Sequence, residues 1–289
     1  AIAEQAMRLS YVSPWSLTNG PAAQLADALA ERAPGDLNNV FFTTGGSTAV
    51  DSALRFTQFY NNFRGLPEKK QIIARAIGYH GSTYLSASCS GKPKDKNHLD
   101  FSELVHHIPC PHPYFRPDGM TIEEFLDEKV ADLKDKILEL GADKVAAFIA
   151  EPIMASGGVV VPPKGYHKRC LEICRKYDVL YISDEVVTAF GRLGHWFASE
   201  EVFDIVPDMI TTAKGLTSGY VPMGALLISD RLMNSFKGGE TVGACFSNGF
   251  TYSGHPVSAA CALKNMEIIE REGLLEHVQE VGPYFQKRL

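Results

Sequence analysis

The chain has 289 residues, 45% of them hydrophobic and 21% charged, which is the composition of a globular protein with room for one large domain or two. Its net charge of −6 argues against binding to nucleic acid or to an anionic membrane surface. No apolar run reaches the about 18 to 20 residues of a membrane-spanning helix, and no signal-peptide pattern is visible. The six cysteines are scattered without a CxxC pair, as in a reduced protein. We therefore expect a cytoplasmic protein.

Helical and strand-like segments alternate in the first part of the chain. A helix is expected to begin at Pro21 behind Asn19, because proline suits the first helical turn and apolar residues follow at helical spacing. The next predicted elements are a strand at 39–44, a helix at 47–63 and a short strand at 70–76.

The segment "HHIPCPHPYF" brings imidazoles and a thiol close together. His106, His107, Cys110 and His112 have side chains that can bind zinc. However, two prolines constrain the segment, and no second group of ligands elsewhere would complete a tetrahedral site. We expect a rigid, partly buried loop and no metal.

The alternation continues to the end of the chain. The predicted elements are helices at 121–140, 166–177, 254–272 and 274–289, and strands at 144–150, 179–183, 209–213 and 224–229. Strands alternating with helices indicate an α/β domain with a mainly parallel sheet, and the nearly continuous apolar strands indicate that helices cover both faces. One dominant domain is expected.

Ligands of open α/β sheets bind beyond the carboxyl ends of the strands. After the first strand, Gly45, Gly46 and Ser47 open a helix, whose free N–H groups can bind a phosphate. A simple capped helix start explains these residues equally well. Tyr79 and His80 follow the second strand, where the tyrosine ring can stack on a flat ligand or simply pack.

Charged residues follow the later strands. Glu151 and Asp184 each end a predicted strand, and Lys214 follows the run at 209–213. A buried lysine is costly, so Lys214 is either at the surface or held there for chemistry. Lysine, carboxylate, aromatic ring and anion site together suit a phosphorylated aromatic aldehyde, because lysine forms a Schiff base and aspartate keeps a pyridine nitrogen protonated.

Six segments in order resemble one enzyme family. They are "FFTTGGSTAVDSAL", "YHGST", "AEPI", "SDEVVTAFGRLG", "TTAKGLTSGYVPMGA" and "FTYSGHPVSAACAL". The chain is similar to the class III pyridoxal-phosphate aminotransferases, most closely to the ω-amino-acid:pyruvate and amine:pyruvate branch. This resemblance implies the large domain of a fold type I enzyme, with a mainly parallel seven-stranded-type sheet flanked by helices. It also implies that the small domain is largely missing.

The resemblance implies a role for each matching residue. Lys214 is the implied Schiff-base lysine, which also moves the proton, and Asp184 pairs with the pyridine nitrogen. Val186 and Tyr79 are implied to lie against the two faces of the cofactor ring. His80 is included among the cofactor-binding residues.

Other cofactor contacts follow from the same resemblance. Gly46 and Ser47 are implied to donate hydrogen bonds to the phosphate, and Glu151 to support the edge of the cofactor. Thr251 is implied to reach the phosphate of the neighbouring subunit, which makes the expected assembly a homodimer.

Two positions depart from this pattern, and a third, inside it, is given no catalytic role. Thr48 stands where many relatives carry glutamate, and Val187 where many carry a polar residue, which leaves the substrate subgroup open. We expect Arg192 to be structural, because arginines between glycines often brace loops through hydrogen bonds to carbonyls.

The implied reaction is the transfer of an amino group from an amine or ω-amino acid to a keto acid such as pyruvate, by a ping-pong mechanism. An aminomutase, a dialkylglycine decarboxylase and a non-catalytic scaffold stay open as alternatives. A nicotinamide dehydrogenase is set aside, because GxGxxG is missing after the first strand. Partners other than small-molecule substrates and a second subunit are not expected.

The resemblance also predicts how the chain is divided. Residues 1–36 are expected to be a helical segment that leads into the large domain. Residues 37–263 are expected to form the domain that binds the cofactor, and 264–289 to start the connection to a C-terminal small domain. The last predicted helix has no C-capping glycine or proline after it. We therefore expect the chain to be the core of a longer enzyme.

Overall fold

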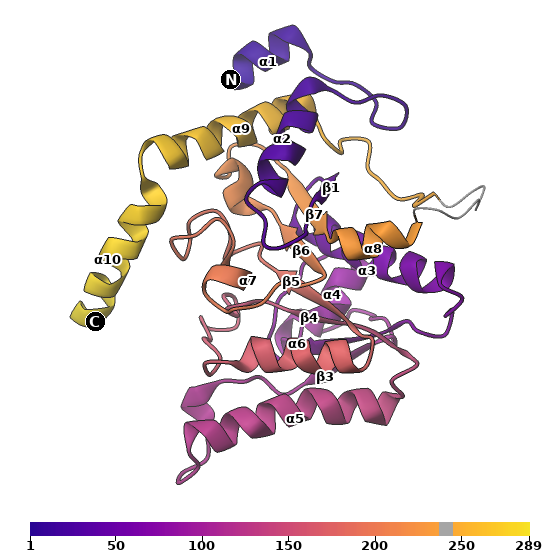
Figure 1. Ribbon diagram of the computed structural model, residues 1–289, viewed down its shortest axis with the longest axis vertical. Helices are drawn as coiled ribbons and strands as arrows, with labels where there is room; N and C mark the ends of the chain where they lie inside the picture. Colours follow the sequence, from indigo (N-terminus) through magenta and orange to yellow (C-terminus); the bar gives the residue numbers. More distant parts are fainter. Residues whose placement is uncertain (237–244) are drawn as a thin grey trace.

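The computed structural model describes residues 1–236 and 245–289, and within them seven strands form one sheet (Figure 1). The strand order is β1-β7-β6-β5-β4-β2-β3. Strands β6, β5, β4, β2 and β3 run parallel, whereas β7 is antiparallel to both β1 and β6. The predicted α/β fold with a mainly parallel sheet is therefore confirmed. The strands are β1 (Asn39–Thr43), β2 (Gln71–Arg75), β3 (Val105–Ile108), β4 (Val145–Ala150), β5 (Leu180–Asp184), β6 (Met209–Thr212) and β7 (Gly224–Ile228).

Two of the longer helices, α2 and α5, begin at residues whose side chains cap them. Asn19 caps α2 by accepting a hydrogen bond from the N–H of Ala22 at 2.9 Å. Thr121 and Glu124 form a capping box at the start of α5. The helices are α1 (Ile2–Arg8), α2 (Gly20–Ala30), α3 (Gly46–Phe63), α4 (Tyr84–Cys89), α5 (Ile122–Leu140), α6 (Tyr166–Lys176), α7 (Ala198–Glu201), α8 (Asp230–Met233), α9 (Pro256–Arg271) and α10 (Leu274–Arg288).

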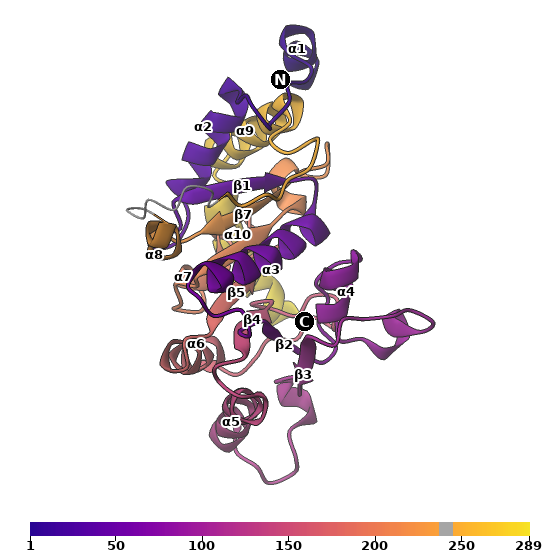
Figure 2. The ribbon, with the colours of Figure 1, turned by 90° about the vertical axis from the view of Figure 1, so that its right-hand side faces the viewer.

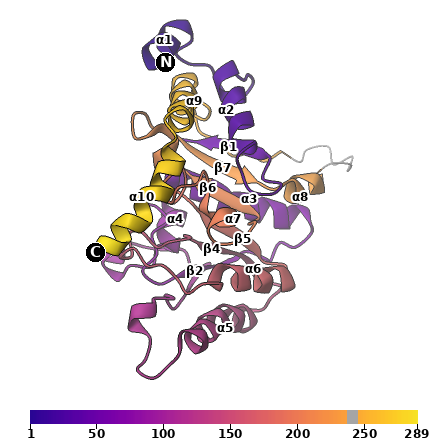
Figure 3. The ribbon, with the colours of Figure 1, turned by 60° about the vertical axis from the view of Figure 1, so that its left-hand side comes forward.

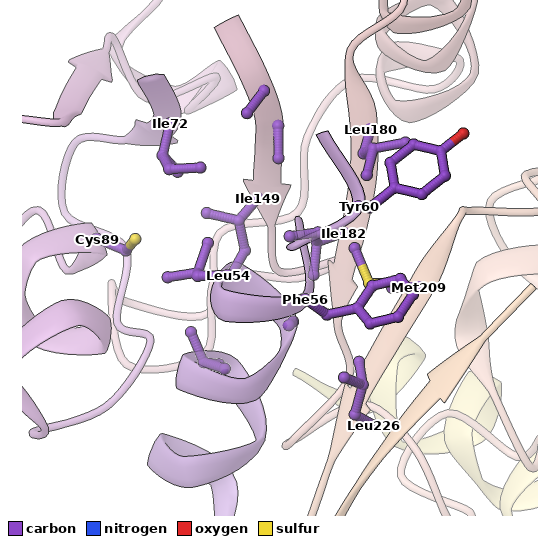
Figure 4. Close-up of a cluster of buried hydrophobic side chains, with 14 of the residues drawn as sticks. Leu54, Phe56, Tyr60, Ile72, Cys89, Ile149, Leu180, Ile182, Met209 and Leu226 are labelled. Carbon is purple, nitrogen blue, oxygen red and sulfur yellow. The ribbon is translucent and has the colours of Figure 1, made fainter. Parts of the chain in front are cut away.

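Helices lie on both faces of the sheet (Figure 2), and the strand residues divide between two helix layers. On one face, Ile182 and Met209 pack with Leu54 and Phe56 of α3, in the cluster drawn in Figure 4. On the other face, α5 and α6 cover β2, β4 and β5, while α2 and α9 cover β6 and β7. Because side chains alternate along a strand, each strand contributes to both layers. The sheet is thus a buried middle layer whose strand ends are held in place from both sides.

Helix α10 differs from the helices that cover the sheet. It extends from α9 along the outside of the molecule (Figure 3) and has no buried residue. Its apolar side chains Val281 and Phe285 are exposed. In the described residues, no helix has the length and apolar character needed to cross a membrane.

The edge strand β3 corrects one prediction. The segment from His106 was expected to be a loop, but His106 and His107 lie in β3, which pairs with β2. Only four residues pair, and prolines follow, so the strand pattern was too short to recognise. Helices α4, α7 and α8 were also not predicted, whereas α1 lies in the segment 1–36 that was expected to be helical.

The side chains of His106, His107 and Cys110, considered above as zinc ligands, contact different partners. The ring of His106 is 2.7 Å from Gln71 Oε1, and that of His107 is 3.1 Å from the carbonyl of Cys89. The thiol of Cys110 lies 3.5 Å from the sulfur of Met154. Within residues 1–236 and 245–289, no group of three metal-binding side chains is assembled.

Candidate active site

One cavity of about 490 Å³ collects most of the predicted site residues beyond the carboxyl ends of β2, β4, β5 and β6. It lies where α/β sheets generally bind ligands. The lining residues are Gly46, Ser47, Tyr79, His80, Gly81, Glu151, Ala155, Ser156, Asp184, Val186, Val187 and Lys214. Of the predicted site residues, only Thr251 is outside this lining.

Asp184 is the last residue of β5 and is only 4% exposed. Its Oδ2 lies 2.7 Å from Nδ1 of His80, and its Oδ1 accepts a hydrogen bond from the N–H of Val186 at 3.2 Å. The backbone of His80 is held in turn, because its main-chain N–H donates to Ser90 Oγ at 2.8 Å. The Nε2 of His80 is buried without a hydrogen-bond partner in the described chain. The carboxylate of Asp184 therefore has a fixed orientation at a buried position.

Glu151 follows β4 and is also 4% exposed. Its two carboxylate oxygens accept hydrogen bonds from the N–H groups of Tyr79 at 3.0 Å and Ala155 at 3.2 Å. Burial raises the pKa of Glu151, and the charges of His80 and Arg75 partly oppose this rise. The guanidinium of Arg75, itself buried, donates to the carbonyl of Glu151. Glu151 thus ties the segment of Tyr79 to the end of β4.

Lys214 comes two residues after β6 and lines the cavity. Its side chain is exposed, so the cost of burying an unpaired ammonium, considered for a lysine at this position, does not arise. Its φ is +33°, a region that residues other than glycine rarely adopt. Strained backbone of this kind is concentrated at functional sites and costs about 1 to 3 kcal/mol. The strain is an independent reason to treat Lys214 as functional.

The start of α3 presents free backbone donors to the cavity. Gly45 is the N-cap and makes no side-chain capping bond, so the N–H groups of Gly46 and Ser47 stay available. Ser47 Oγ instead accepts a hydrogen bond from the N–H of Ser82 at 3.0 Å. A Cβ on Gly81 would lie 2.6 Å from Ser47 Oγ, so only glycine fits there. An eighteen-residue helix that starts in this way fits a phosphate group.

Apolar and aromatic side chains complete the lining. A Cβ on Gly46 would lie 3.0 Å from Val186 Cγ1, so the glycine lets the helix start approach this valine closely. The hydroxyl of Tyr79 is 2.9 Å from Ser82 Oγ. Val186 and Tyr79 are suited to the faces of a flat ring. Val187 also lines the cavity, whereas Thr48 only closes the preceding turn by donating to the carbonyl of Gly45 at 2.8 Å.

Glu185 is a structural residue that the sequence analysis did not single out. It is fully buried, and its carboxylate accepts hydrogen bonds from the N–H groups of Ala198 at 2.7 Å and Ser199 at 2.9 Å. The hydroxyls of Ser199 and Thr188 donate to it as well, at 2.6 and 3.0 Å. Burial raises the pKa of Glu185, and these hydrogen bonds oppose the rise. The sequence feature that could have identified Glu185 is its charge, directly after a buried strand.

Arg192 does not have the bracing role expected for it. Its side chain is exposed and makes no hydrogen bond or ion pair with any residue that the structure describes. The loop is held instead by Glu185 and by Gln279, whose side-chain amide donates to the carbonyl of Gly194 at 2.6 Å. The glycines near Arg192 therefore did not predict correctly that its side chain braces the loop.

Thr251 lies apart from the cavity within the single chain. It is exposed, and its carbonyl accepts a hydrogen bond from the hydroxyl of Tyr11 at 3.0 Å. A residue that serves a second subunit has to be exposed in one chain, but many exposed residues have no such role. Its action across a subunit boundary stays a prediction.

Comparison with known proteins agrees with this geometry. The family description "Aminotransferase class-III" matches residues 1–289. The chain therefore belongs to the class-III aminotransferases, and its cofactor is pyridoxal 5′-phosphate. The free donors of α3, the buried Asp184 and the exposed Lys214 fit that cofactor.

Three similar proteins illustrate the range of the family. The chain is 42% identical to mitochondrial gamma-aminobutyrate transaminase 1 of Oryza sativa, with 99% of this chain and 56% of the relative aligned. It is 45% identical to putrescine–pyruvate aminotransferase of Pseudomonas aeruginosa, with 93% and 58% aligned. An omega transaminase from Pseudomonas jessenii, solved in complex with PMP, superimposes with a TM-score of 0.93 at 40% identity, covering 98% of this chain and 63% of that one. The chain thus spans little more than half the length of these curated relatives.

Proposed function

We propose that this chain forms the cofactor-binding part of an aminotransferase that moves an amino group from an amine or ω-amino acid to a keto acid such as pyruvate. The observation that carries the proposal is the single cavity that unites Lys214, Asp184 and the free N–H groups of α3. A lysine, a buried carboxylate and an anion site within one cavity have no joint structural purpose in this fold.

The catalytic roles are divided between two residues. When bound, pyridoxal phosphate supplies an electron-accepting ring that acidifies a C–H bond of the donor. The carboxylate of Asp184 holds the proton on the ring nitrogen, and His80 at 2.7 Å keeps this carboxylate oriented. Lys214 would hold the cofactor through Nζ; once the donor amine has displaced it, the freed amine would accept the proton from the donor carbon and return it during the transfer.

The remaining lining residues bind and orient the cofactor. Gly46 and Ser47 donate their N–H groups to the phosphate, where the dipole of α3 adds to the attraction. Val186 and Tyr79 cover the two faces of the ring and exclude water from them. Glu151 supports the ring edge through its hold on the N–H of Tyr79.

The site is proposed to be completed in a homodimer. Thr251 of one subunit would donate to the phosphate held by the other, which is consistent with its exposed position in one chain. Sedimentation analysis is expected to give a dimer, and Thr251→Ala is expected to weaken cofactor binding. A monomer that binds the cofactor tightly would contradict this arrangement. The domain boundaries expected at residues 36 and 263 stay part of the proposal.

Reductive trapping tests the proposed cofactor attachment. The holoenzyme is expected to be yellow, and borohydride should fix the cofactor covalently to Lys214. Peptide mapping identifies the labelled lysine, and Lys164, which does not line the cavity, is an internal control. A label on any other lysine would overturn the assignment, and a protein that binds no cofactor would support the scaffold alternative.

The reaction type needs a product assay. A panel of amine donors with pyruvate as acceptor is expected to give the keto product and alanine in equal amounts. Formation of carbon dioxide would support a decarboxylase, and an isomer of the donor would support an aminomutase.

A further inference from the structure

Lys92 is a cation beside the cavity that the proposed chemistry does not use. Its ammonium donates to Ser156 Oγ and lies 5.9 Å from the centre of the Tyr79 ring. Ser156 and Tyr79 line the cavity, whereas Lys92 is not part of the lining. Lys92 therefore lies directly beside two residues of the cavity wall.

The backbone that carries Lys92 is held firmly. The N–H of the preceding residue, Gly91, donates to the carbonyl of Gly78 at 2.9 Å. A Cβ on Gly91 would lie 2.4 Å from the carbonyl oxygen of Arg75, so this segment is packed directly on the end of β2. A charge mounted in this way needs little reorganisation to bind a ligand.

Lys92 also lacks a carboxylate partner. Lys69, Lys129 and Lys168 each pair with an aspartate or glutamate. In contrast, no acidic side chain of the described residues lies within ion-pair distance of Lys92, although the residue is half-buried. A partly desolvated ammonium that donates only to a hydroxyl retains donors for an anion.

We propose that Lys92 binds the distal carboxylate of the substrate and so selects ω-amino acids over diamines. This inference rests on the proposed function. Because Lys92 contacts the exposed Ser156 and no contact joins it to Asp184 or Lys214, it would meet the distal end of an extended substrate and not a group on the reacting carbon. The positive charge would attract a terminal carboxylate and repel a second ammonium group. The two curated relatives are named for gamma-aminobutyrate and for putrescine, and Lys92 favours the first kind of donor.

Three donors of similar length separate the charge effect from all others. The donors 4-aminobutyrate, butylamine and putrescine end in a carboxylate, a methyl group and an ammonium group. In the holoenzyme, Lys92→Met is expected to raise the KM for 4-aminobutyrate about tenfold, as for a partly buried ion pair. The KM for butylamine should stay the same and that for putrescine should fall. Lys92→Arg should retain the preference of the unaltered protein.

Lys94→Met is the matched control, since it removes the same charge from an exposed site two residues away. It should leave all three KM values unchanged. Binding of butyrate, which has the carboxylate but no amine, gives a second readout by saturation-transfer NMR, and this signal should weaken in Lys92→Met only.

Each outcome bears on one proposal or on both. Equal changes for 4-aminobutyrate and butylamine in Lys92→Met would show a structural role and overturn the inference. An unchanged KM for 4-aminobutyrate would overturn it as well, while leaving the transaminase function in place. If the unaltered holoenzyme turned over none of the three donors with any keto acid, the proposed function and this inference would fail together.

Discussion

Asp184, His80 and Glu151 form the floor of the cavity, whereas Lys92 and Ser156 form its rim. The floor residues are at most 4% exposed, lie at or just after strand ends, and are held by several hydrogen bonds each. The rim residues lie in loops, and one hydrogen bond joins them. The geometry of the floor is thus set by the sheet, while the rim can change without moving it. Substitutions in the floor should affect the chemistry or the fold, and substitutions in the rim should affect the choice of substrate.

The largest effect is expected for Asp184→Asn. The amide retains the shape but cannot hold a proton on the ring nitrogen, so proton transfer from the donor should slow by about 10³-fold. Stopped-flow absorbance of the first half-reaction measures this step, and the spectrum of the resting holoenzyme controls for cofactor binding. Nearly normal turnover would remove Asp184 from its proposed role.

Glu185→Gln tests whether the neighbouring residue serves the fold alone. The substitution replaces a buried carboxylate that accepts four hydrogen bonds, so the free energy of unfolding should fall by about 3 kcal/mol. Chemical denaturation measures this change, with the exposed Glu200→Gln as the control. A variant of full stability that has lost only turnover would show that Glu185 belongs to the chemistry instead.

Buried His167 gives a prediction for pH. Its Nε2 donates to the carbonyl of Pro152, the residue after Glu151, at 2.9 Å, so in the neutral ring Nδ1 accepts from Tyr181 Oη at 2.7 Å. Burial lowers its pKa to about 3 from 6.5. Between these values the unfolded chain binds a proton that the folded chain does not. Stability should therefore fall as pH drops below 6.5, by about 2 kcal/mol at pH 5.

Denaturation curves at pH 7, 6 and 5 measure this dependence. His167→Gln should be less stable at pH 7 but should lose less of its remaining stability on acidification. Parallel pH dependence in the two proteins would assign the effect to other groups.

The smallest effect is expected for Arg192→Ala. Because this side chain is exposed and contacts no described residue through hydrogen bonds or ion pairs, its removal should change the free energy of unfolding by less than about 0.5 kcal/mol. Gln279→Ala, which removes the hydrogen bond to Gly194, should cost about 1 kcal/mol. If thermal denaturation showed a larger loss of stability for Arg192→Ala than for Gln279→Ala, Arg192 would have the bracing role after all.

The sequence analysis predicted the floor better than the rim for a physical reason. Strand ends can be recognised from apolar runs, so the sequence alone predicts that Asp184, Glu151 and Lys214 lie at one edge of the sheet. The contact between Lys92 and Ser156 joins residues 64 positions apart in two loops, and no periodicity reports it. The bond between His80 and Asp184 spans 104 positions and depends equally on how β2 and β5 are arranged in the sheet.

The short elements were missed for a related reason. β3 has four residues and α4 has six, so neither gives more than two periods of a recognisable pattern. Their existence depends on tertiary contacts with β2 and α3, which local sequence does not encode.

The pairing of β5 with β6 places Asp184 directly opposite Thr211, three residues before Lys214. Adjacent strands lie about 4.8 Å apart. Their main-chain hydrogen bonds therefore set the separation of the Asp184 carboxylate and the Lys214 amine, and the surrounding side chains do not. Loops at the entrance can be lengthened, shortened or exchanged without changing this separation. Such an arrangement lets a lineage acquire new substrates through its loops while the reacting pair is inherited intact, and it gives the protein engineer the same freedom.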